Sequence, residues 1–275
     1  MGRVRAGSFE GTAAEGTGAW RGGPWRPAAP SAPGRGVRPN DVGFAIVCCA
    51  ALGAYNNVIH RHPWHHRRYV ALNTAATGAV LSAAMASGLR PADLGFGRGA
   101  WSPGRAGAGL AAAAATGWVL VAVTPATRPM LNDKRITNLG GRAIAYQAAV
   151  RIPLGTVLWE EAAFRGVLQA ALRRVLPEIP AIVVTSGVFG IWHIRPTLQA
   201  LRVNGLSGDR RQAIARVGAA VGVTAAGGAL LSVLRARSGS LTAPVLVHLA
   251  TNSVPMVAAW ALANPPAGRA RRETG

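Results

Sequence analysis

Residues 143–172 have the sequence AIAYQAAVRIPLGTVLWEEAAFRGVLQAAL, a long apolar run that contains two adjacent glutamates, Glu160 and Glu161, and one arginine, Arg165. The run exceeds the about 20 residues that a helix needs to cross the hydrocarbon core of a bilayer. An ionised side chain at the bilayer centre costs roughly 2.5 to 3.5 kcal/mol even on the lenient insertion scale. Three such groups in one helix therefore indicate a functional interior.

Six other apolar segments accompany this run, and most have the length of a membrane-spanning helix. The seven predicted spans are residues 42–59, 70–87, 106–123, 143–172, 181–194, 213–234 and 241–262. The fifth span is short, so we expect it to be re-entrant or covered by its neighbours. Arg151, Pro153 and Gly155 interrupt the fourth, which predicts either one kinked helix or two pieces that meet there. The expected fold is an all-α polytopic membrane helical bundle with about seven, between six and eight, transmembrane helices.

The composition agrees with a membrane protein, because the 275 residues are 50% hydrophobic with a mean hydropathy of +0.23. A formal charge of +20 suggests nucleic-acid binding in a soluble protein, but these arginines lie in the tails and between the apolar spans, and only 6% of residues are aromatic. This placement favours anionic lipid headgroups, so the expected partner is the lipid bilayer and no nucleic acid. Cys48 and Cys49 are neighbours in the first span and are expected to pack rather than to form a disulfide.

The composition divides the chain into three parts. Residues 1–39 form a predicted disordered basic tail rich in Gly, Pro and Arg, residues 40–264 the transmembrane domain with its core motifs in 151–255, and residues 265–275 a basic C-terminal tail. Lys and Arg divide almost evenly between the two sides, so no orientation is predicted. The loop after the first span is rich in histidine, but its flanking arginines and its lack of a carboxylate favour an interfacial basic loop over a metal site. Its histidines are His60, His62, His65 and His66.

Glu160 and Glu161 are adjacent carboxylates in an apolar helix, where their charges need compensation. Neighbouring carboxylates in a low dielectric raise each other's proton affinity, and burial acts in the same direction, which suits one of them to act as a general base. Arg165 lies four residues after Glu161 on the same helical face, where an ion pair would hold Glu161 charged. Glu160 points about 100 degrees away and is free to face a cavity. The alternative is a buried salt bridge that only fixes helix packing.

Two further polar clusters lie in the later spans. His193 follows Phe189 by four residues, so the two rings share one face, and this histidine is either a packed core residue or a catalytic one. His248 and Asn252 form another pair with the same spacing. Polar side chains in separate membrane helices satisfy one another only by converging on a common interior. We therefore expect all of these groups to meet in one cavity.

The order and spacing of these groups resemble those of the CPBP intramembrane proteases, the family that includes the CAAX prenyl endopeptidases and bacteriocin-processing or self-immunity proteins. The family motifs are Glu-Glu-x-x-x-Arg, Phe-x-x-x-His and His-x-x-x-Asn, each on a membrane helix. All three are complete here, as Glu160, Glu161 and Arg165, Phe189 and His193, and His248 and Asn252. The resemblance covers about residues 151–255. The sequence PADLGF at residues 91–96 also resembles a short segment that many bacterial members carry before a membrane helix.

The resemblance implies hydrolysis of a peptide bond in or near the bilayer. Glu160 with His193 would polarise a water, while His248 and Asn252 would donate hydrogen bonds to the oxyanion. The expected catalytic residues are Glu160, Glu161, His193, His248 and Asn252, with Arg165 and Phe189 as orienting residues. No cofactor is expected, because a glutamate/histidine site activates water without a cation and the sequence has no His-Glu-x-x-His helix. The alternative is a zinc site formed by Glu160, His193 and His248.

Other functional classes remain open at this stage. The leading expectation is a multi-pass endopeptidase of a bacterial plasma membrane, because the content of Ala, Gly and Arg is typical of a GC-rich bacterium, and its partner would be a membrane-associated peptide or protein substrate. One alternative is a non-catalytic membrane scaffold or bacteriocin self-immunity protein. Another is a proton-coupled transporter, although no internal repeat of the kind many carriers show is found. The sequence predicts neither the cleavage site nor the oligomeric state.

Overall fold

The computed structural model describes residues 37–58, 67–97 and 99–265. Most of these residues are helical, and one isolated β-bridge joins Phe96 to Ser240. The predicted basic tails fall almost entirely on residues 1–36 and 266–275, and the histidine-rich loop falls on residues 59–66, so these predictions lie outside the described residues.

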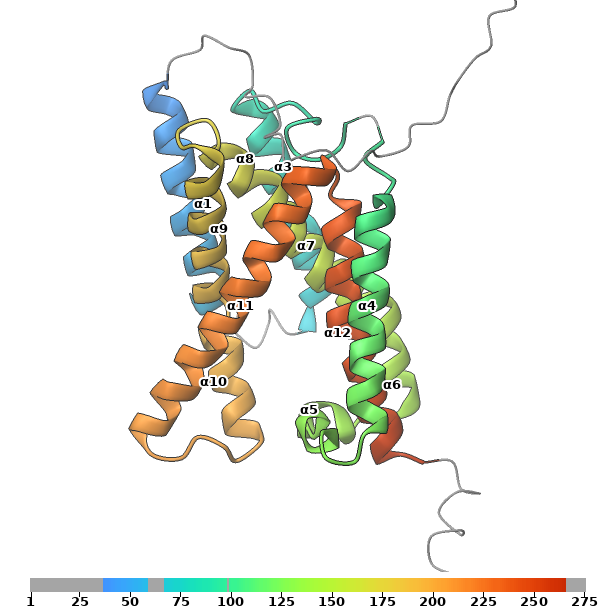
Figure 1. The fold of residues 1–275 in the computed structure, drawn as a ribbon. Coiled ribbons are helices and arrows are strands. Elements are labelled where there is room, and N and C mark those ends of the chain that lie inside the picture. The colour runs from blue at the N-terminus through green and yellow to red at the C-terminus, as the bar shows by residue number, and fades with distance from the viewer. Residues whose placement is uncertain (1–36, 59–66, 98, 266–275) are drawn as a thin grey trace, which may run out of the picture.

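The described residues form a bundle of long apolar helices around a central helical segment, with five helices long enough to cross a membrane; Figure 1 shows their arrangement. The five are α1 (Pro39–Val58), α3 (Tyr69–Ala86), α4 (Gly104–Val123), α11 (Arg210–Ser238) and α12 (Thr242–Ala263), and each is long and apolar enough to cross a membrane. The segment between them, residues 141–172, is called here the central helix. α12 packs along α4, α11 packs along α9 (Glu178–Trp192), and the central helix contacts α1, α3, α9, α11 and α12. The predicted all-α polytopic bundle is thereby confirmed.

The other two predicted spans do not have the form of simple transmembrane helices. α9 has only 15 residues, fewer than the about 20 that cross a bilayer. The central helix consists of α6 (Gly141–Tyr146), η3 (Gln147–Val157), α7 (Leu158–Glu160), η4 (Glu161–Leu168) and α8 (Gln169–Leu172), and every residue of η4 and α8 is buried. The motif-bearing segment is thus enclosed by protein, which is what its charged side chains require.

The central helix passes through its sequence interruptions without a break. η3 and η4 are π-helical, with backbone bonds from Leu158 N–H to the Pro153 carbonyl and from Gln169 N–H to the Phe164 carbonyl. Proline lacks the N–H of an ordinary helical bond, and the wider π-helical turn accommodates it. Of the two expected alternatives, two separate pieces are replaced by one continuous helical run. Single π-helical turns occur often at functional sites.

Helix α3 supports the central helix where glycine permits close approach. A Cβ added at Gly155 would lie 2.8 Å from Cε1 of Tyr69, so only glycine fits against this ring. The buried Asn73 side chain donates a 2.6 Å hydrogen bond to the Gly155 carbonyl, and Tyr55 on α1 donates to the Asn73 side-chain oxygen at 2.8 Å. Two outer helices are therefore joined to the central helix by hydrogen bonds within the bundle.

Two short helices complete the end of the bundle seen at the bottom of Figure 1. α5 (Lys134–Thr137) follows the 3-10 helix η2 (Arg128–Leu131), and α10 (Ile194–Val203) begins directly after His193. Asn204 joins the two, because its Nδ2 donates to Asp133 Oδ1 at 3.1 Å and its Oδ1 accepts from Lys134 N–H at 2.9 Å.

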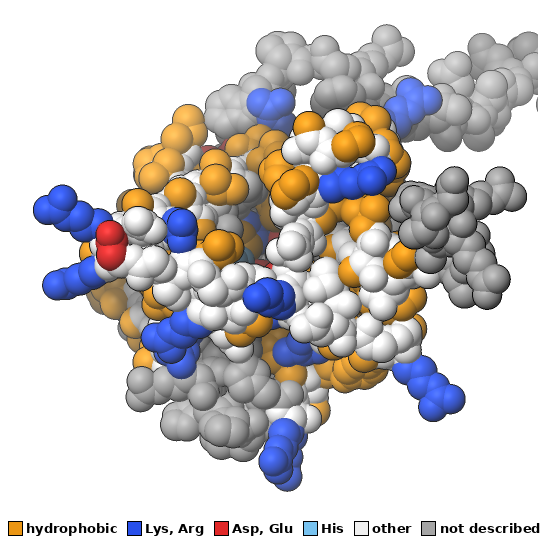
Figure 2. Space-filling view, turned by 90° about the horizontal axis from the view of Figure 1, so that it is seen from below, with side chains coloured by type: hydrophobic (Ala, Val, Ile, Leu, Met, Phe, Trp, Pro, Cys, Tyr) orange, Lys and Arg blue, Asp and Glu red, His pale blue; other side chains and the backbone are white. Residues whose placement is uncertain are grey.

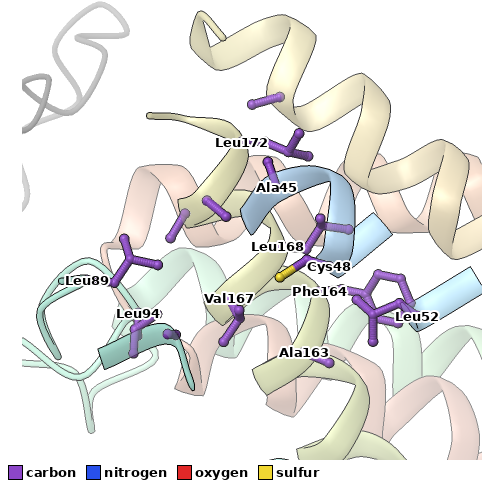
Figure 3. Close-up of a cluster of buried hydrophobic side chains, with 14 of the residues drawn as sticks. Ala45, Cys48, Leu52, Leu89, Leu94, Ala163, Phe164, Val167, Leu168 and Leu172 are labelled. Carbon is purple, nitrogen blue, oxygen red and sulfur yellow. The ribbon is translucent and has the colours of Figure 1, made fainter. Parts of the chain in front are cut away.

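The apolar core lies at the opposite end of the central helix. Side chains from α1 and from the segment 89–94 pack onto η4 and α8 in Figure 3. The labelled residues are Ala45, Cys48, Leu52, Leu89, Leu94, Ala163, Phe164, Val167, Leu168 and Leu172. Cys48 is a buried member of this cluster, and Cys48 and Cys49 are both free thiols, which confirms their predicted packing role.

Candidate active site

Glu161 and Arg165 form the buried ion pair that their spacing predicts. Arg165 Nη1 donates to Glu161 Oε1 at 2.9 Å, and both side chains are completely buried. His248 on α12 lies against the same carboxylate oxygen, with Nδ1 at 2.7 Å from Glu161 Oε1. Because an ionised carboxylate only accepts hydrogen bonds, this contact requires the proton of His248 on Nδ1. Glu161 therefore orients the His248 ring so that its Nε2 faces away from the ion pair.

Three contacts fix the Arg165 guanidinium. Besides the bond to Glu161, its Nη2 donates to the Gly228 carbonyl of α11 at 3.3 Å, and its Cζ lies 4.1 Å from the centre of the Phe189 ring. A Cβ added at Gly228 would lie 3.0 Å from the Phe189 ring and 3.3 Å from Arg165 Nη2. A cation held over an aromatic face and paired with a carboxylate is well compensated despite full burial. Phe189 thus contacts the Arg165 guanidinium, and its orienting role stays a prediction.

Glu160 points away from this pair and lines a cavity of about 630 Å³. Its Oε1 accepts a hydrogen bond from Trp192 Nε1 at 3.1 Å, whereas its Oε2 is buried and makes no hydrogen bond within the described part of the chain. This free oxygen lies 3.8 Å from His248 Nε2, which is beyond direct hydrogen-bond distance. Asn56 on α1 donates to the Trp192 carbonyl at 2.7 Å and so holds the end of α9 that carries the indole.

His193 and Asn252 line the same cavity as Glu160 and His248. His193 Nδ1 lies 2.8 Å from the Phe189 carbonyl oxygen, which can only accept, so Nδ1 donates and Nε2 is left as an acceptor. The Phe189 ring packs edge-on against His193, with centroids 4.6 Å apart. The expected convergence is therefore observed for four side chains, while Glu161 lies behind them and reaches the cavity only through His248.

The sequence analysis missed the residues that position these groups. Asn56 and Asn73 are polar residues within apolar spans, and that signal alone marks an intramembrane residue as functional. Trp192 stands inside the motif between Phe189 and His193, but no sequence pattern indicates that its indole donates to Glu160. That contact depends on how α9 lies across the central helix.

The zinc alternative does not fit the described residues. Among them, no three His, Cys, Asp or Glu side chains are gathered so that they could hold a metal ion.

Comparison with known proteins agrees with this geometry. Residues 143–254 match the family model described as Type II CAAX prenyl endopeptidase Rce1-like. No curated protein and no solved structure matches the chain. The matched segment contains all three motifs, the buried Glu161–Arg165 ion pair and most of the residues that line the cavity. This multi-pass membrane protein is therefore similar, over residues 143–254, to the Rce1-like type II CAAX prenyl endopeptidase family, in agreement with the resemblance of its motifs.

Proposed function

We propose that the chain hydrolyses a peptide bond in or beside the bilayer, with Glu160 as general base for a water nucleophile. The observation that carries this proposal is the buried, unpaired Oε2 of Glu160 in a cavity that it shares with His193, His248 and Asn252. A buried carboxylate oxygen without a hydrogen-bond donor lowers the stability of the fold. We infer that this oxygen is present because it binds and deprotonates the water nucleophile. The match to a CAAX-type endopeptidase family supports this assignment.

The proposed reaction has two steps. Glu160 takes a proton from water, helped by the free Nε2 of His193, and the water oxygen bonds to the scissile carbonyl carbon. The resulting oxyanion accepts hydrogen bonds from protonated His248 at Nε2 and from the Asn252 amide. The tetrahedral intermediate then expels the amine, which receives its proton from Glu160. Glu161 acts as a positioning residue, because it holds His248 at Nδ1.

The charges of the buried groups agree with this assignment. Glu160 and Glu161 together with Arg165 and a protonated His248 form a set of zero net charge, so the site needs no additional counter-ion. A donor such as Asn or His aimed at a developing oxyanion contributes about a hundredfold to a thousandfold in rate. It contributes most where water is scarce.

The mechanism proposed here is metal-free, and we expect cleavage to persist in the presence of EDTA. The purified intact protein, reconstituted in liposomes, is assayed for initial rate after treatment with EDTA and again after addition of Zn²⁺. A rate within about twofold of the untreated value is expected, since water-bound catalytic zinc would account for several orders of magnitude. Loss of activity that Zn²⁺ restores would contradict the metal-free mechanism.

Trp192→Phe is expected to lower kcat/KM by about tenfold to a hundredfold, the effect of one hydrogen bond to a charged group. The phenyl ring retains most of the packing but not the N–H that contacts Glu160 Oε1. Trp159→Phe is the matched control, because the buried Nε1 of Trp159 has no hydrogen-bond partner in the described residues. Equal effects of the two substitutions on cleavage would show that the indole hydrogen bond does not matter.

The function is tested by quantitative mass spectrometry of peptide termini in cells that express either the intact protein or Glu160→Gln at matched membrane levels. We expect new termini near membrane segments only with the intact protein. These termini identify both the membrane-associated substrate and its cleavage sequence. Identical termini in the two samples, with good coverage of membrane proteins, would overturn the proposal in favour of a scaffold or self-immunity protein.

We further propose a bacterial plasma membrane as the location of the protein, on the basis of the composition.

A further inference from the structure

A helical hairpin forms one side of the lower end of the bundle in Figure 1. It consists of α10, the loop after it and the start of α11, residues 194–220, and is called here the arm. No residue of the arm is buried, whereas the later part of α11 carries every buried residue of that helix. Segments with few buried contacts open at a lower free-energy cost than the core of a protein. The arm is therefore the part of the cavity wall that can move most easily.

The arm is held together as one unit. Asp209 caps the start of α11, because its Oδ1 accepts a hydrogen bond from Gln212 N–H at 2.8 Å. Arg216 Nη1 donates to the Leu206 carbonyl, which ties α11 to the loop before it. α10 and α11 also pack against each other. The position of the whole arm is therefore set by its contacts with the rest of the bundle.

One end of the arm is fixed to the bundle. The chain turns into the arm at His193, and close by a Cβ added at Gly190 would lie 2.8 Å from the Val221 carbonyl oxygen. Beyond this crossing of α9 and α11, Gln169 Nε2 on the central helix donates to the Ser232 carbonyl at 3.1 Å. Both connections of the arm thus leave the bundle at one level, which is the geometry of a hinge.

The other end of the arm reaches the bundle through Asn204. Its Nδ2 donates to Asp133 Oδ1 at 3.1 Å, and its Oδ1 accepts from Lys134 N–H at 2.9 Å. These two bonds join the end of α10 to the start of α5 and are called here the latch. Asn204 Nδ2 also donates to the Ala200 carbonyl at 3.0 Å, which fixes the side chain on α10.

The acceptor in the latch is an ionised carboxylate at neutral pH. Partial burial raises the pKa of Asp133, but hydrogen bonds from Arg135 and Asn204 outweigh this effect, and the pKa is lowered from its ordinary value. The stability that these bonds contribute is present above the ordinary pKa of an aspartate and is lost as the pH falls through the lowered value. Hydrogen bonds to ionised groups are about twice as strong as those between neutral groups. A single asparagine can therefore hold the arm.

The arm and α5 both line the cavity that contains Glu160. Figure 2 views the bundle from the end that carries α5 and α10, where a hollow lies near the centre of the described surface. α10 begins directly after His193, so a movement of the arm changes both the access to Glu160 and the position of the His193 ring. The lining residues of the arm are Arg195, Pro196, Leu198, Gln199 and Arg202, and that of α5 is Arg135.

We propose that the arm is a lid over the cavity, which the latch between Asn204 and α5 holds closed and which opens to admit a substrate chain. Lids over active sites exclude water when closed and must open for substrate to enter and product to leave. The closed arm keeps His193 beside Glu160. The movement of the arm does not depend on the proposed proteolysis, whereas its effect on cleavage rests on that function.

Distances between two spin labels test whether the latch holds the arm. The labels are attached to Met130→Cys and Arg211→Cys, because both side chains are exposed and neither lines the cavity. Cys48 and Cys49 are replaced by alanine so that only the new thiols react. We expect one main distance with Asn204 in place. Asn204→Leu should add a longer distance and raise the ratio of open to closed arms by about tenfold, the effect of one hydrogen bond to a charged group.

A matched control exists on the fixed side of the bundle. Asn264 Nδ2 donates to the Thr137 carbonyl at 3.3 Å, so this side chain also contacts α5, but from the end of α12 rather than from the arm. Asn264→Leu removes the same kind of side chain and a comparable hydrogen bond. It is expected to leave the single distance unchanged.

A reversible cross-link tests whether the arm must open for cleavage. Asn204→Cys and Lys134→Cys, in the protein without the two native thiols, are joined by a short thiol-specific reagent and released by dithiothreitol. Lys134 is chosen because its replacement leaves the carboxylate of the latch in place. In liposomes, the cross-linked protein should cleave a substrate from the terminus analysis at less than about a tenth of the rate of the reduced protein. The same cross-link between Asn264→Cys and Thr137→Cys does not involve the arm and should leave the rate unchanged.

Two results would overturn the lid. The first is an unchanged distance distribution in Asn204→Leu, because the latch would then not hold the arm. The second is full activity of the protein that is cross-linked between residues 134 and 204, because the arm would then not need to open. If the intact protein cleaves nothing, the proposed function fails, and the distances alone decide whether the arm opens.

Discussion

Glu160→Gln is expected to slow peptide-bond hydrolysis by about 10²-fold to 10⁴-fold, the range for removal of a general base. Glutamine has the shape of glutamate and keeps an oxygen that accepts the hydrogen bond from Trp192 Nε1. It lacks the basic oxygen that would take the proton from water. The variant should therefore remain folded and inserted, with the defect in kcat. Initial rates on a peptide substrate in liposomes, together with thermal unfolding of the same sample, measure both quantities.

A matched control exists at the start of α9. Glu178→Gln makes the same chemical change at a carboxylate that pairs with Arg173 at 3.3 Å, outside the cavity. Its rate should equal that of the intact protein within about twofold, since this carboxylate does not line the cavity that contains Glu160. A Glu160→Gln protein that retains half or more of the activity would refute the role of Glu160 as the base.

Arg165→Met should lower the free energy of unfolding by about 3 to 5 kcal/mol, the effect of leaving one member of a buried ion pair unpaired. Glu161 would then be a fully buried carboxylate whose remaining partner is His248. Methionine retains much of the side-chain volume, so lost packing is a minor cause. Thermal or denaturant-induced unfolding in detergent micelles measures this difference.

Arg90→Met provides the exposed counterpart to this substitution. Arg90 pairs with Asp93 at 3.4 Å, but 72% of its side chain is exposed, and such pairs contribute about 0 to 1 kcal/mol. If Arg165→Met and Arg90→Met unfolded alike, the buried pair would have no special role in the bundle. Adding Glu161→Gln to Arg165→Met should recover part of the stability, because it removes the unpaired charge.

The part of this molecule that could be predicted from sequence is the part set by local spacing. The separation of four residues between Glu161 and Arg165 predicts their ion pair, and a π-helical turn preserves it because four residues still complete nearly one turn. Convergence of the motifs also followed, since buried polar groups in a bilayer have only one another as partners.

Contacts between residues far apart in the sequence could not be predicted in the same way. His248 and Glu161 are 87 residues apart, and their 2.7 Å contact depends on the packing of α12 against the central helix. Arg195 and Arg202 of α10 line the cavity because the chain turns at His193, and no local spacing predicts that turn. Small-residue positions were equally ambiguous, because an added Cβ would meet neighbouring atoms at Gly228 but nothing within 4 Å at Gly218, Gly222 or Gly227.

The complete burial of η4 and α8 has a consequence for the order in which the protein is synthesised and inserted. During synthesis the chain emerges from its N-terminus, so Glu161 and Arg165 are made well before Gly228 and His248, which complete their surroundings. Until then two carboxylates and one guanidinium would face lipid with only their own ion pair as compensation. The segment must therefore be sheltered from lipid until α11 and α12 arrive, and the helices downstream of the catalytic motif act as the final step of its insertion.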